Sequence, residues 1–234
     1  MNKTSKVIKE DEDYQIIFKP PFVLSEDISL LICHRLDFET SGLLLVAKNK
    51  DAQEFYQVQF KNRQIKKKYL ALVLGQPEKR KLVVEGFLSR AQKKPFKFES
   101  SITVKKEDNL DHKSFKILGK KSRWSKTEFK VLETKKIKVF KEKKYQKFNE
   151  ISLIEARPYT GRRHQIRIHL SHLGYPILGD KVYNTKLSRK GSKILSIPHL
   201  QLFSIYLKFK NCRKQEVLVD ISDKQKTELL DKLG

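Results

Sequence analysis

The first quarter of the chain alternates short apolar runs with polar turns. Residues 15–18 have the pattern of a short strand that ends at Lys19 before a proline, and residues 43–47 are an apolar run of strand length. This run is continuous, which is typical of a strand buried on both faces. Residues 50–61 instead show a helical pattern, and Asn49 stands at the position of its N-cap. A third strand is expected at residues 69–74, closed by a glycine.

The rest of the chain adds more strands than helices. The further strands are expected at residues 82–88, 98–104, 127–133, 151–157, 200–209 and 216–220. Residues 163–173 form a helical pattern, with Gly174 suited to the C′ position and Pro176 preventing continuation. A short helix is expected at residues 223–233. Many short strands with few helices predict an α+β fold with an antiparallel or mixed sheet.

A chain of 234 residues fits one domain that buries its own core. We expect residues 1–12 to form an N-terminal tail and residues 13–234 a single domain. No apolar run approaches the ~20 residues that a membrane-spanning helix needs, and residues 1–13 lack the pattern of a secretory signal. Cys33 and Cys212 lie far apart and form neither a disulfide framework nor a metal site. The expected location is therefore the reducing cytoplasm.

The charge balance points to a polyanionic partner. The chain has 51 basic and 27 acidic residues, a net charge of +24. This favours nucleic acid first and an anionic membrane second, although 40 lysines against 11 arginines also fit codon bias on a solvated surface. The most basic stretch, residues 103–147, has 16 basic and 6 acidic residues interleaved with aromatic ones. Two interpretations of this stretch remain open: edge strands with solvated lysines, or a surface that binds nucleic-acid phosphates.

Two segments in the first half carry candidate chemistry. The segment HRLDFETSG at residues 34–42 brings the Asp37 carboxylate to the edge of the buried strand at 43–47. A carboxylate placed in this way can be a nucleophile, a base or a metal ligand, and a structural Asp–Arg pair is the alternative. The segment KYLALVLG at residues 68–75 begins a strand with Tyr69. A tyrosine there is more often a core residue than a catalytic one.

A third segment, residues 157–170, turns through a Thr-Gly pair into a helix that is rich in arginine and histidine. His164, His169 and the following His172 raise the question of a zinc site. The spacing of five between His164 and His169 suits helical chelation poorly, and no cysteine or acid completes the set. We therefore expect no metal.

Together, HRLDxxTSGLLL, KYxAxVxG and TGRxHQIRxHLxxLGxPILGDxxY resemble the RluA family of RNA pseudouridine synthases. The order and spacing of the motifs match, as does SKTEFKVL at residues 125–132, and the resemblance covers roughly residues 13–220. It implies the pseudouridine synthase fold, an α+β fold whose mixed or antiparallel sheet has a central catalytic cleft and flanking helices. It also implies isomerisation of uridine in RNA without a cofactor: the N1–C1′ bond breaks, the base turns, and C5 joins C1′.

The resemblance assigns three catalytic residues. Asp37 matches the catalytic aspartate, which acts as nucleophile or base on a flipped-out uridine. Arg167 matches the arginine that pairs with this aspartate and favours its ionised form. Tyr69 matches a tyrosine that stacks on the base and assists proton removal.

The resemblance also implies residues that contact the substrate. Arg35 matches an arginine that fills the place of the extruded base, and Leu202 aligns with an aliphatic residue that packs beside the base. The segment around Leu202 has diverged, with Phe203 where many relatives have histidine. The other candidates are His34, Thr40, Arg162, Arg163, His164 and Gln165, of which the two arginines lie near a helix N-terminus that can bind phosphate.

The chain departs from the family pattern at two points before the first motif. His34 follows Lys19 by only fifteen residues, where most relatives have several tens, so a loop is missing or shortened. Only 33 residues precede His34, which leaves no room for the N-terminal S4 domain of some relatives. We expect the catalytic domain to bind RNA largely by itself and the high charge to serve that need.

Three functions remain open, from different classes. The leading hypothesis is a stand-alone, monomeric RNA pseudouridine synthase that acts on rRNA or tRNA and not on DNA or a membrane. The second is a non-catalytic RNA-binding or ribosome-assembly factor that keeps the fold, supported by the shortened segment before His34. The third is a metal-dependent nuclease or other hydrolase that uses the histidine and aspartate residues.

Overall fold

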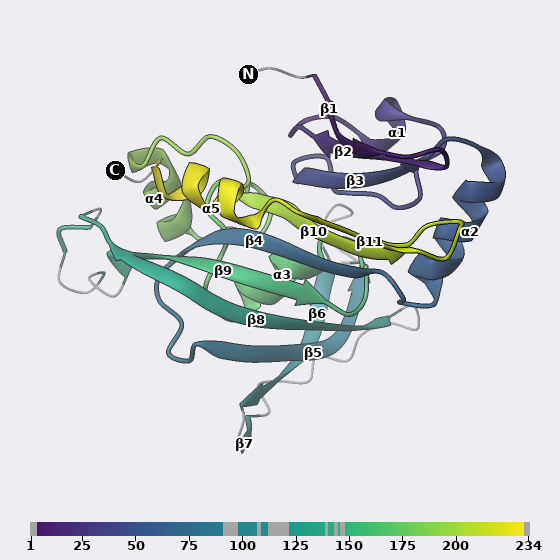
Figure 1. Ribbon diagram of the computed structural model, residues 1–234. Helices are drawn as coiled ribbons and strands as arrows, with labels where there is room; N and C mark the ends of the chain where they lie inside the picture. The colour runs from purple at the N-terminus through teal and green to yellow at the C-terminus, as the bar shows by residue number, and fades with distance from the viewer. Residues whose placement is uncertain are drawn as a thin grey trace. The chain divides into compact units, whose positions relative to one another are not determined.

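The computed structural model describes residues 4–90, 98–106, 109–111, 122–138, 140–142, 145 and 148–231. The chain divides into two compact units (Figure 1). The first comprises Met1–Leu70 and Leu202–Gly234, and the second comprises Ala71–Gln201. Strand β4 (Lys66–Leu74) begins in the first unit and ends in the second.

The first unit has a mixed arrangement of strands in the order β1-β2-β3-β10-β4, with β11 also paired to β10. Its other elements are β1 (Lys6–Glu10), β2 (Tyr14–Lys19), α1 (Ser25–Ile28), β3 (Ser41–Ala47), α2 (Lys50–Lys61), β10 (Leu202–Lys210), β11 (Glu216–Asp220) and α5 (Ser222–Asp231). β2 and β3 are antiparallel, whereas β3 and β10 are parallel. All seven residues of β3 are buried, which confirms the strand expected at residues 43–47.

Residues 6–10 form strand β1, where the sequence predicted a tail. β1 pairs antiparallel with β2 through a register shift between Val7 and Lys9. All five of its side chains are exposed, so no apolar alternation marks the strand in the sequence.

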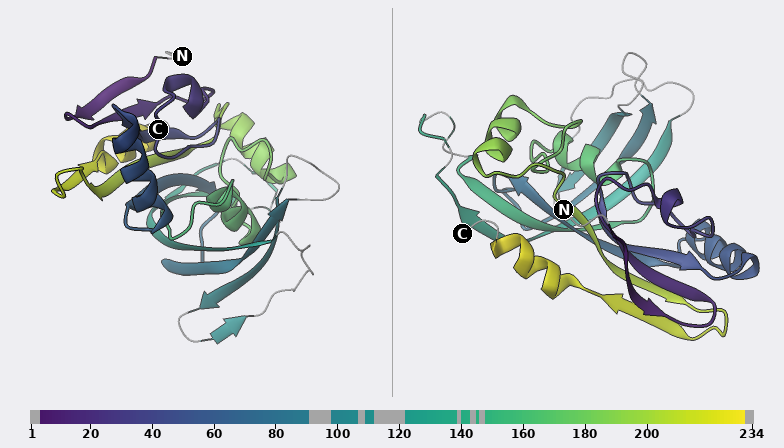
Figure 2. Two further views of the ribbon diagram at one scale, coloured as in Figure 1. Left: turned by 90° about the vertical axis from the view of Figure 1, so that its right-hand side faces the viewer. Right: turned by 90° about the horizontal axis from the view of Figure 1, so that it is seen from above.

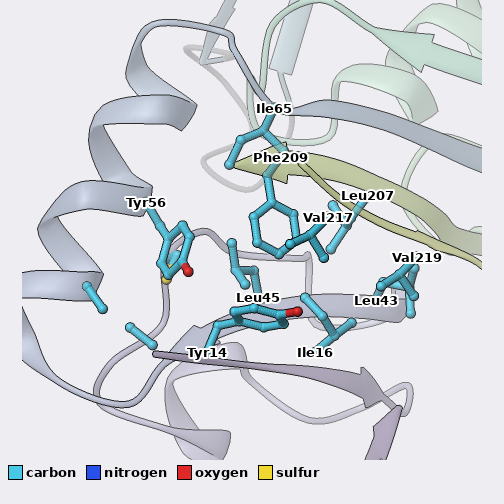
Figure 3. Close-up of a cluster of buried hydrophobic side chains, with 13 residues drawn as sticks. Tyr14, Ile16, Leu43, Leu45, Tyr56, Ile65, Leu207, Phe209, Val217 and Val219 are labelled. Atoms are coloured by element: carbon cyan, nitrogen blue, oxygen red, sulfur yellow. The ribbon is translucent and has the colours of Figure 1, made fainter. Parts of the chain in front are cut away.

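The core of the first unit contains three aromatic rings (Figure 3). Tyr14 lies edge-to-face against Phe209, with ring centroids 5.2 Å apart, and Tyr56 packs against both. Tyr56 comes from α2, which is N-capped as predicted: the Asn49 side chain accepts a hydrogen bond from the Ala52 N–H at 2.8 Å. These contacts hold α2 against β2 and β10.

The second unit contains the remaining strands, in the order β4-β9-β8-β5-β6-β7 (labelled in Figure 1). Its elements are β5 (Lys81–Arg90), β6 (Phe98–Lys106), β7 (Asn109–Asp111), β8 (Arg123–Lys136), β9 (Glu150–Pro158), α3 (Gln165–His172) and α4 (Lys186–Ile194). β9, β8, β5, β6 and β7 are successive antiparallel neighbours. The helix predicted at residues 163–173 is α3, and Gly174 follows it with φ +89°, as a C′ glycine does.

Helices and a mixed, mostly antiparallel set of strands confirm the predicted α+β class. Helix α4 was not predicted: it is short and consists mostly of lysine and serine, with few apolar residues to mark it. Part of the basic stretch at residues 103–147, including Lys120 and Lys121, lies outside the described residues. Within the described ranges, no helix is long and apolar enough to cross a membrane.

Candidate active site

The loop that carries Asp37 precedes β3 and is fixed at both ends. The Thr40 N–H donates to the Asp37 carbonyl at 3.0 Å, which closes a turn around the half-buried aspartate. On the other side, Ser25 Oγ accepts from the Leu36 N–H at 3.1 Å and donates to the Leu36 carbonyl at 3.3 Å. Helix α1, which begins at Ser25, therefore holds the loop just before Asp37.

A close approach between β3 and β10 determines where this loop lies. Ser41 and Gly42 pair in parallel with Phe203 and Ser204. Gly42 has φ +113°, and a Cβ atom there would lie 2.1 Å from the Ser204 carbonyl oxygen, so only glycine fits. Because parallel strands present the same ends at one edge, the Asp37 loop and the buried start of β10 lie at one edge of the first unit.

Tyr69 is a buried residue of β4, the strand next to β10 in the first unit. Burial raises the pKa of its phenol, and the nearby Asp37 carboxylate raises it further. The aspartate and the tyrosine assigned by the resemblance therefore lie within electrostatic reach of each other. The phenol stays protonated at neutral pH.

Lys19, at the end of β2, is an element of the site that sequence reasoning missed. Its side chain is fully buried, and Nζ donates to the carbonyls of Pro20 (3.0 Å), Val23 (2.8 Å) and Phe38 (3.3 Å). Burial lowers the pKa of Lys19 to about 8, and the Asp37 carboxylate opposes this shift. The amine therefore ties the turn after β2 to the residue that follows Asp37.

His34, predicted to contact the substrate, is anchored within the protein. Its Nε2 accepts from the Leu45 N–H of β3 at 3.1 Å, and its ring packs on Phe60 with centroids 4.5 Å apart. Burial lowers the pKa of His34 to about 3, and the charge of Lys67 lowers it further. The ring is therefore neutral and carries its proton on Nδ1.

Two other predicted substrate residues of this loop differ in exposure. Arg35 is largely exposed, with 64% of its side chain accessible and Glu26 3.5 Å away. Thr40 is buried, and within the described residues its Oγ1 has no hydrogen-bond partner.

Arg167 lies in the second unit, where it forms a buried two-point ion pair with Asp180. The Nε–Oδ2 and Nη2–Oδ1 distances are both 2.8 Å. Burial alone would raise the pKa of Asp180, but Arg167 and the N–H groups of Val182 and Tyr183 outweigh it and keep the pKa below its usual value. Asp180 ends the PILGD portion of the third motif, but the sequence suggested no role for it.

Gln165, another predicted substrate residue, forms its hydrogen bonds within the second unit. Its Oε1 accepts from Thr160 Oγ1 (2.6 Å) and the Arg162 N–H (3.1 Å). Its Nε2 donates to the Lys126 carbonyl (2.9 Å) and Thr127 Oγ1 (2.8 Å). An amide has two donors and two acceptor positions, so this side chain braces the turn before α3.

The neighbouring predicted residues include both hydrogen-bonded and exposed side chains. His164 has φ +56°, and its Nδ1 lies 2.9 Å from the Tyr183 hydroxyl. Arg162 Nε donates to the Trp124 carbonyl at 3.0 Å, whereas Arg163 is exposed. Arg163 is thus the most accessible of the basic residues at this turn.

The histidines of α3 have partners other than a metal. His169 is fully buried, burial lowers its pKa to about 3, and its Nε2 lies 3.1 Å from Ser125 Oγ. Because Ser125 donates its proton to the Gly86 carbonyl, His169 is the donor in this contact. In the described part of the chain, no three histidine, cysteine or acidic side chains cluster as metal ligands.

The chain is similar to known proteins in sequence and in fold. Residues 13–172 match the family model described as RNA pseudouridylate synthase. The chain is 34% identical over 187 residues to ribosomal large subunit pseudouridine synthase C of Vibrio parahaemolyticus, covering 80% of this chain and 49% of the relative. It is 33% identical over 152 residues to ribosomal large subunit pseudouridine synthase D of Borreliella burgdorferi, covering 65% and 37%. The chain thus spans about half, or less, of the length of these relatives.

A solved structure shares the fold at lower sequence identity. Human RNA pseudouridylate synthase domain containing 1 superposes with a TM-score of 0.72 at 24% identity, covering 94% of this chain and 84% of that one. The family match extends over more than half of the chain and includes the Asp37 loop, Tyr69 and Arg167. The chain therefore belongs to the RNA pseudouridylate synthase family and is of the RluA type.

Proposed function

We propose that this chain isomerises specific uridines in structured RNA to pseudouridine. The observation that carries the proposal is that the half-buried Asp37 carboxylate lies within electrostatic reach of a buried, protonated phenol, Tyr69, in the first unit. Two relatives are named for the ribosomal large subunit, which favours large-subunit rRNA over tRNA as the first substrate to test. The proposal includes action as a monomer in the cytoplasm, on RNA and not on DNA, without a cofactor.

In the proposed reaction, Asp37 acts on a uridine that has left the RNA stack. The carboxylate either attacks C1′ or removes a proton from the sugar, and in both cases the N1–C1′ bond breaks. The base turns, and C5 bonds to C1′ as the ester bond to Asp37 breaks or, in the second case, as the proton returns to the sugar. The C5 proton is then lost and N1 gains a proton. The product is an isomer of the substrate, so no oxidant or co-reactant enters the balance.

The roles of the remaining residues follow from their charge states and exposure. The raised pKa of Tyr69 favours a neutral phenol that stacks on the base and donates a hydrogen bond, over a standing phenolate. The resemblance assigns Arg167 to the Asp37 carboxylate, and the two-point bond with Asp180 would hold that guanidinium in one orientation. Arg35 and Arg163 are exposed and suit contacts with RNA.

The test uses Asp37→Asn, with Asp27→Asn as a matched control at an exposed aspartate of α1. Purified proteins are incubated with rRNA and tRNA from a strain that lacks this gene, and pseudouridine is mapped by carbodiimide labelling and primer extension. We expect new stops with the wild type and with Asp27→Asn, and none with Asp37→Asn, whose RNA affinity should stay within a few fold of the wild type.

Three results would contradict the proposal. Turnover retained by Asp37→Asn would remove the aspartate from the mechanism. Tight binding of both RNAs by the wild type without any new stop would favour the assembly-factor function. Strand cleavage that EDTA abolishes would favour a metal-dependent hydrolase.

A further inference from the structure

A groove of about 470 Å³ lies on the first unit, apart from the loop that carries Asp37. The end of α2, the start of β4 and the β10–β11 hairpin form its walls, and the hairpin turn lies near the carboxyl end of α2 (Figures 1 and 2). The walls carry four lysines, Lys66, Lys208, Lys210 and Lys214, against one carboxylate, Glu216.

Most of this positive charge is not neutralised. Lys208 Nζ lies 2.7 Å from the Glu216 carboxylate, so these two charges offset each other. Lys66, Lys210 and Lys214 are exposed, and none of the three forms an ion pair with any residue that the structure describes. The groove therefore presents a net charge of about three positive units in a concave surface, which concentrates its electrostatic potential.

The walls of the groove are held in place by buried hydrogen bonds. Gln59 of α2 is buried; its Nε2 donates to the Lys210 carbonyl at 2.7 Å, and its Oε1 accepts from the Lys210 N–H at 3.1 Å. The hairpin turn is closed by the Lys214 N–H, which donates to the Asn211 carbonyl at 2.8 Å. Lys214 has φ +61°, a left-handed conformation that favours glycine. A lysine rather than a glycine occupies this turn.

We infer that this groove binds backbone phosphates of the RNA outside the target uridine. The inference rests on the proposed function. A polyanion with regularly spaced phosphates matches three exposed lysines on fixed walls better than a single small anion would. The partly buried ring of Phe55 also lines the groove and allows sugar or base edges to pack between the phosphate contacts.

The distance between the catalytic edge and the groove determines how long an RNA must be to contact both. Ser204, which pairs with Gly42 at the catalytic edge, and Lys210 are six residues apart on β10, a distance of about 20 Å along the strand. At about 3.4 Å per phosphate along one strand of a duplex, this corresponds to roughly six nucleotides. An RNA that ends close to the target uridine should therefore reach Asp37 but not the groove.

The experiment combines a groove variant with RNAs of two lengths. Lys66, Lys210 and Lys214 are replaced by glutamine together, and the control replaces Lys9, Lys50 and Lys224, which are exposed elsewhere in the same unit. Affinity is measured between 0.05 and 0.3 M salt, about the range in which phosphate contacts dominate, for an RNA extending about twelve nucleotides beyond the target and for one ending about two nucleotides beyond it. Thermal unfolding checks that both variants fold.

On the long RNA, we expect the groove variant to lose on the order of tenfold in affinity at 0.15 M salt and to show a salt slope smaller by about two to three. On the short RNA, the groove variant, the control and the wild type should bind alike. If the groove variant has an unchanged salt slope on the long RNA while the wild type isomerises both RNAs, the inference that the groove binds phosphates is wrong. The proposed function then still stands. Absence of isomerisation by the wild type on either RNA counts against the proposed function instead.

Discussion

The buried Lys19 amine supports the Asp37 loop, and replacing Lys19 with methionine tests whether its pKa is lowered in the folded protein. The wild-type side chain is fully buried, and its pKa falls from an ordinary value of 10.5 to about 8 in the folded state. Methionine keeps much of the length and volume but removes the titrating group. The comparison of the two proteins therefore isolates the pH dependence that Lys19 contributes.

The sign of that dependence follows from proton binding. Between about pH 8 and pH 10.5 the unfolded chain keeps a proton on Lys19 that the folded protein has largely lost. Because the unfolded state then binds more protons, the free energy of unfolding of the wild type rises with pH relative to the variant. Below pH 7 both states are protonated, and the difference between the two proteins should be flat.

The magnitude is a few kcal/mol. A lowering of the pKa from 10.5 to about 8 corresponds to about 3 kcal/mol over the whole range, of which about 2 kcal/mol is reached by pH 9.5. Urea unfolding followed by circular dichroism at pH 7.0 and 9.5 measures this gain, and the other lysines and tyrosines cancel in the comparison. Lys9→Met, at an exposed position, serves as the control. If the difference in the free energy of unfolding between the wild type and Lys19→Met is the same at both pH values within about 0.5 kcal/mol, the pKa of Lys19 is not lowered.

Three further substitutions test the supports of the site. Gly42→Ala should destabilise the protein by about 3 kcal/mol or more, because its Cβ would lie 2.1 Å from the Ser204 carbonyl oxygen at a positive φ, and a thermal midpoint near that of the wild type would contradict this. Asp180→Asn should cost about 3–5 kcal/mol in urea unfolding by leaving the Arg167 guanidinium buried without its countercharge, and a loss below about 1 kcal/mol would mean that this pair is not a main support. Asn49→Ala should cost about 1 kcal/mol by removing the cap of α2, and an unchanged urea midpoint would show that the cap adds nothing.

The strands of this fold were predictable from sequence where burial leaves a continuous or alternating apolar pattern. β3 is buried along its whole length, and its run of leucine and valine identified it directly. Helix α2 was marked by its cap as much as by its apolar face. β1 and α4 escaped prediction for a common reason: their stability depends on pairing and capping with neighbours, while their own side chains are mostly polar or exposed.

The charged supports of the site could not be predicted, because burial of a charge depends on partners that are remote in sequence. Lys19 was expected only to mark the end of a strand before a proline. Its buried environment requires the carbonyl of Phe38, nineteen residues away, to converge with those of Pro20 and Val23. Asp180 stands thirteen residues from Arg167, beyond the end of α3, so no helical spacing pairs the two.

Motif matching identifies residues that belong to a site, but it does not separate those that touch the substrate from those that hold the site together. Gln165 has all four hydrogen-bonding positions occupied within the protein, and a contact with RNA would leave one of its buried partners unsatisfied. His34 likewise uses Nε2 on β3 and is kept neutral by burial. Arg35 and Arg163 are exposed cations, and the ion pair of Arg35 with Glu26 at 3.5 Å is itself exposed, so phosphate contacts require no buried hydrogen bond to break. We therefore propose that, among the residues of the motifs, the exposed arginines contact RNA and the buried polar residues keep the loop and the turn rigid, a division that follows from hydrogen-bond accounting and not from the motif.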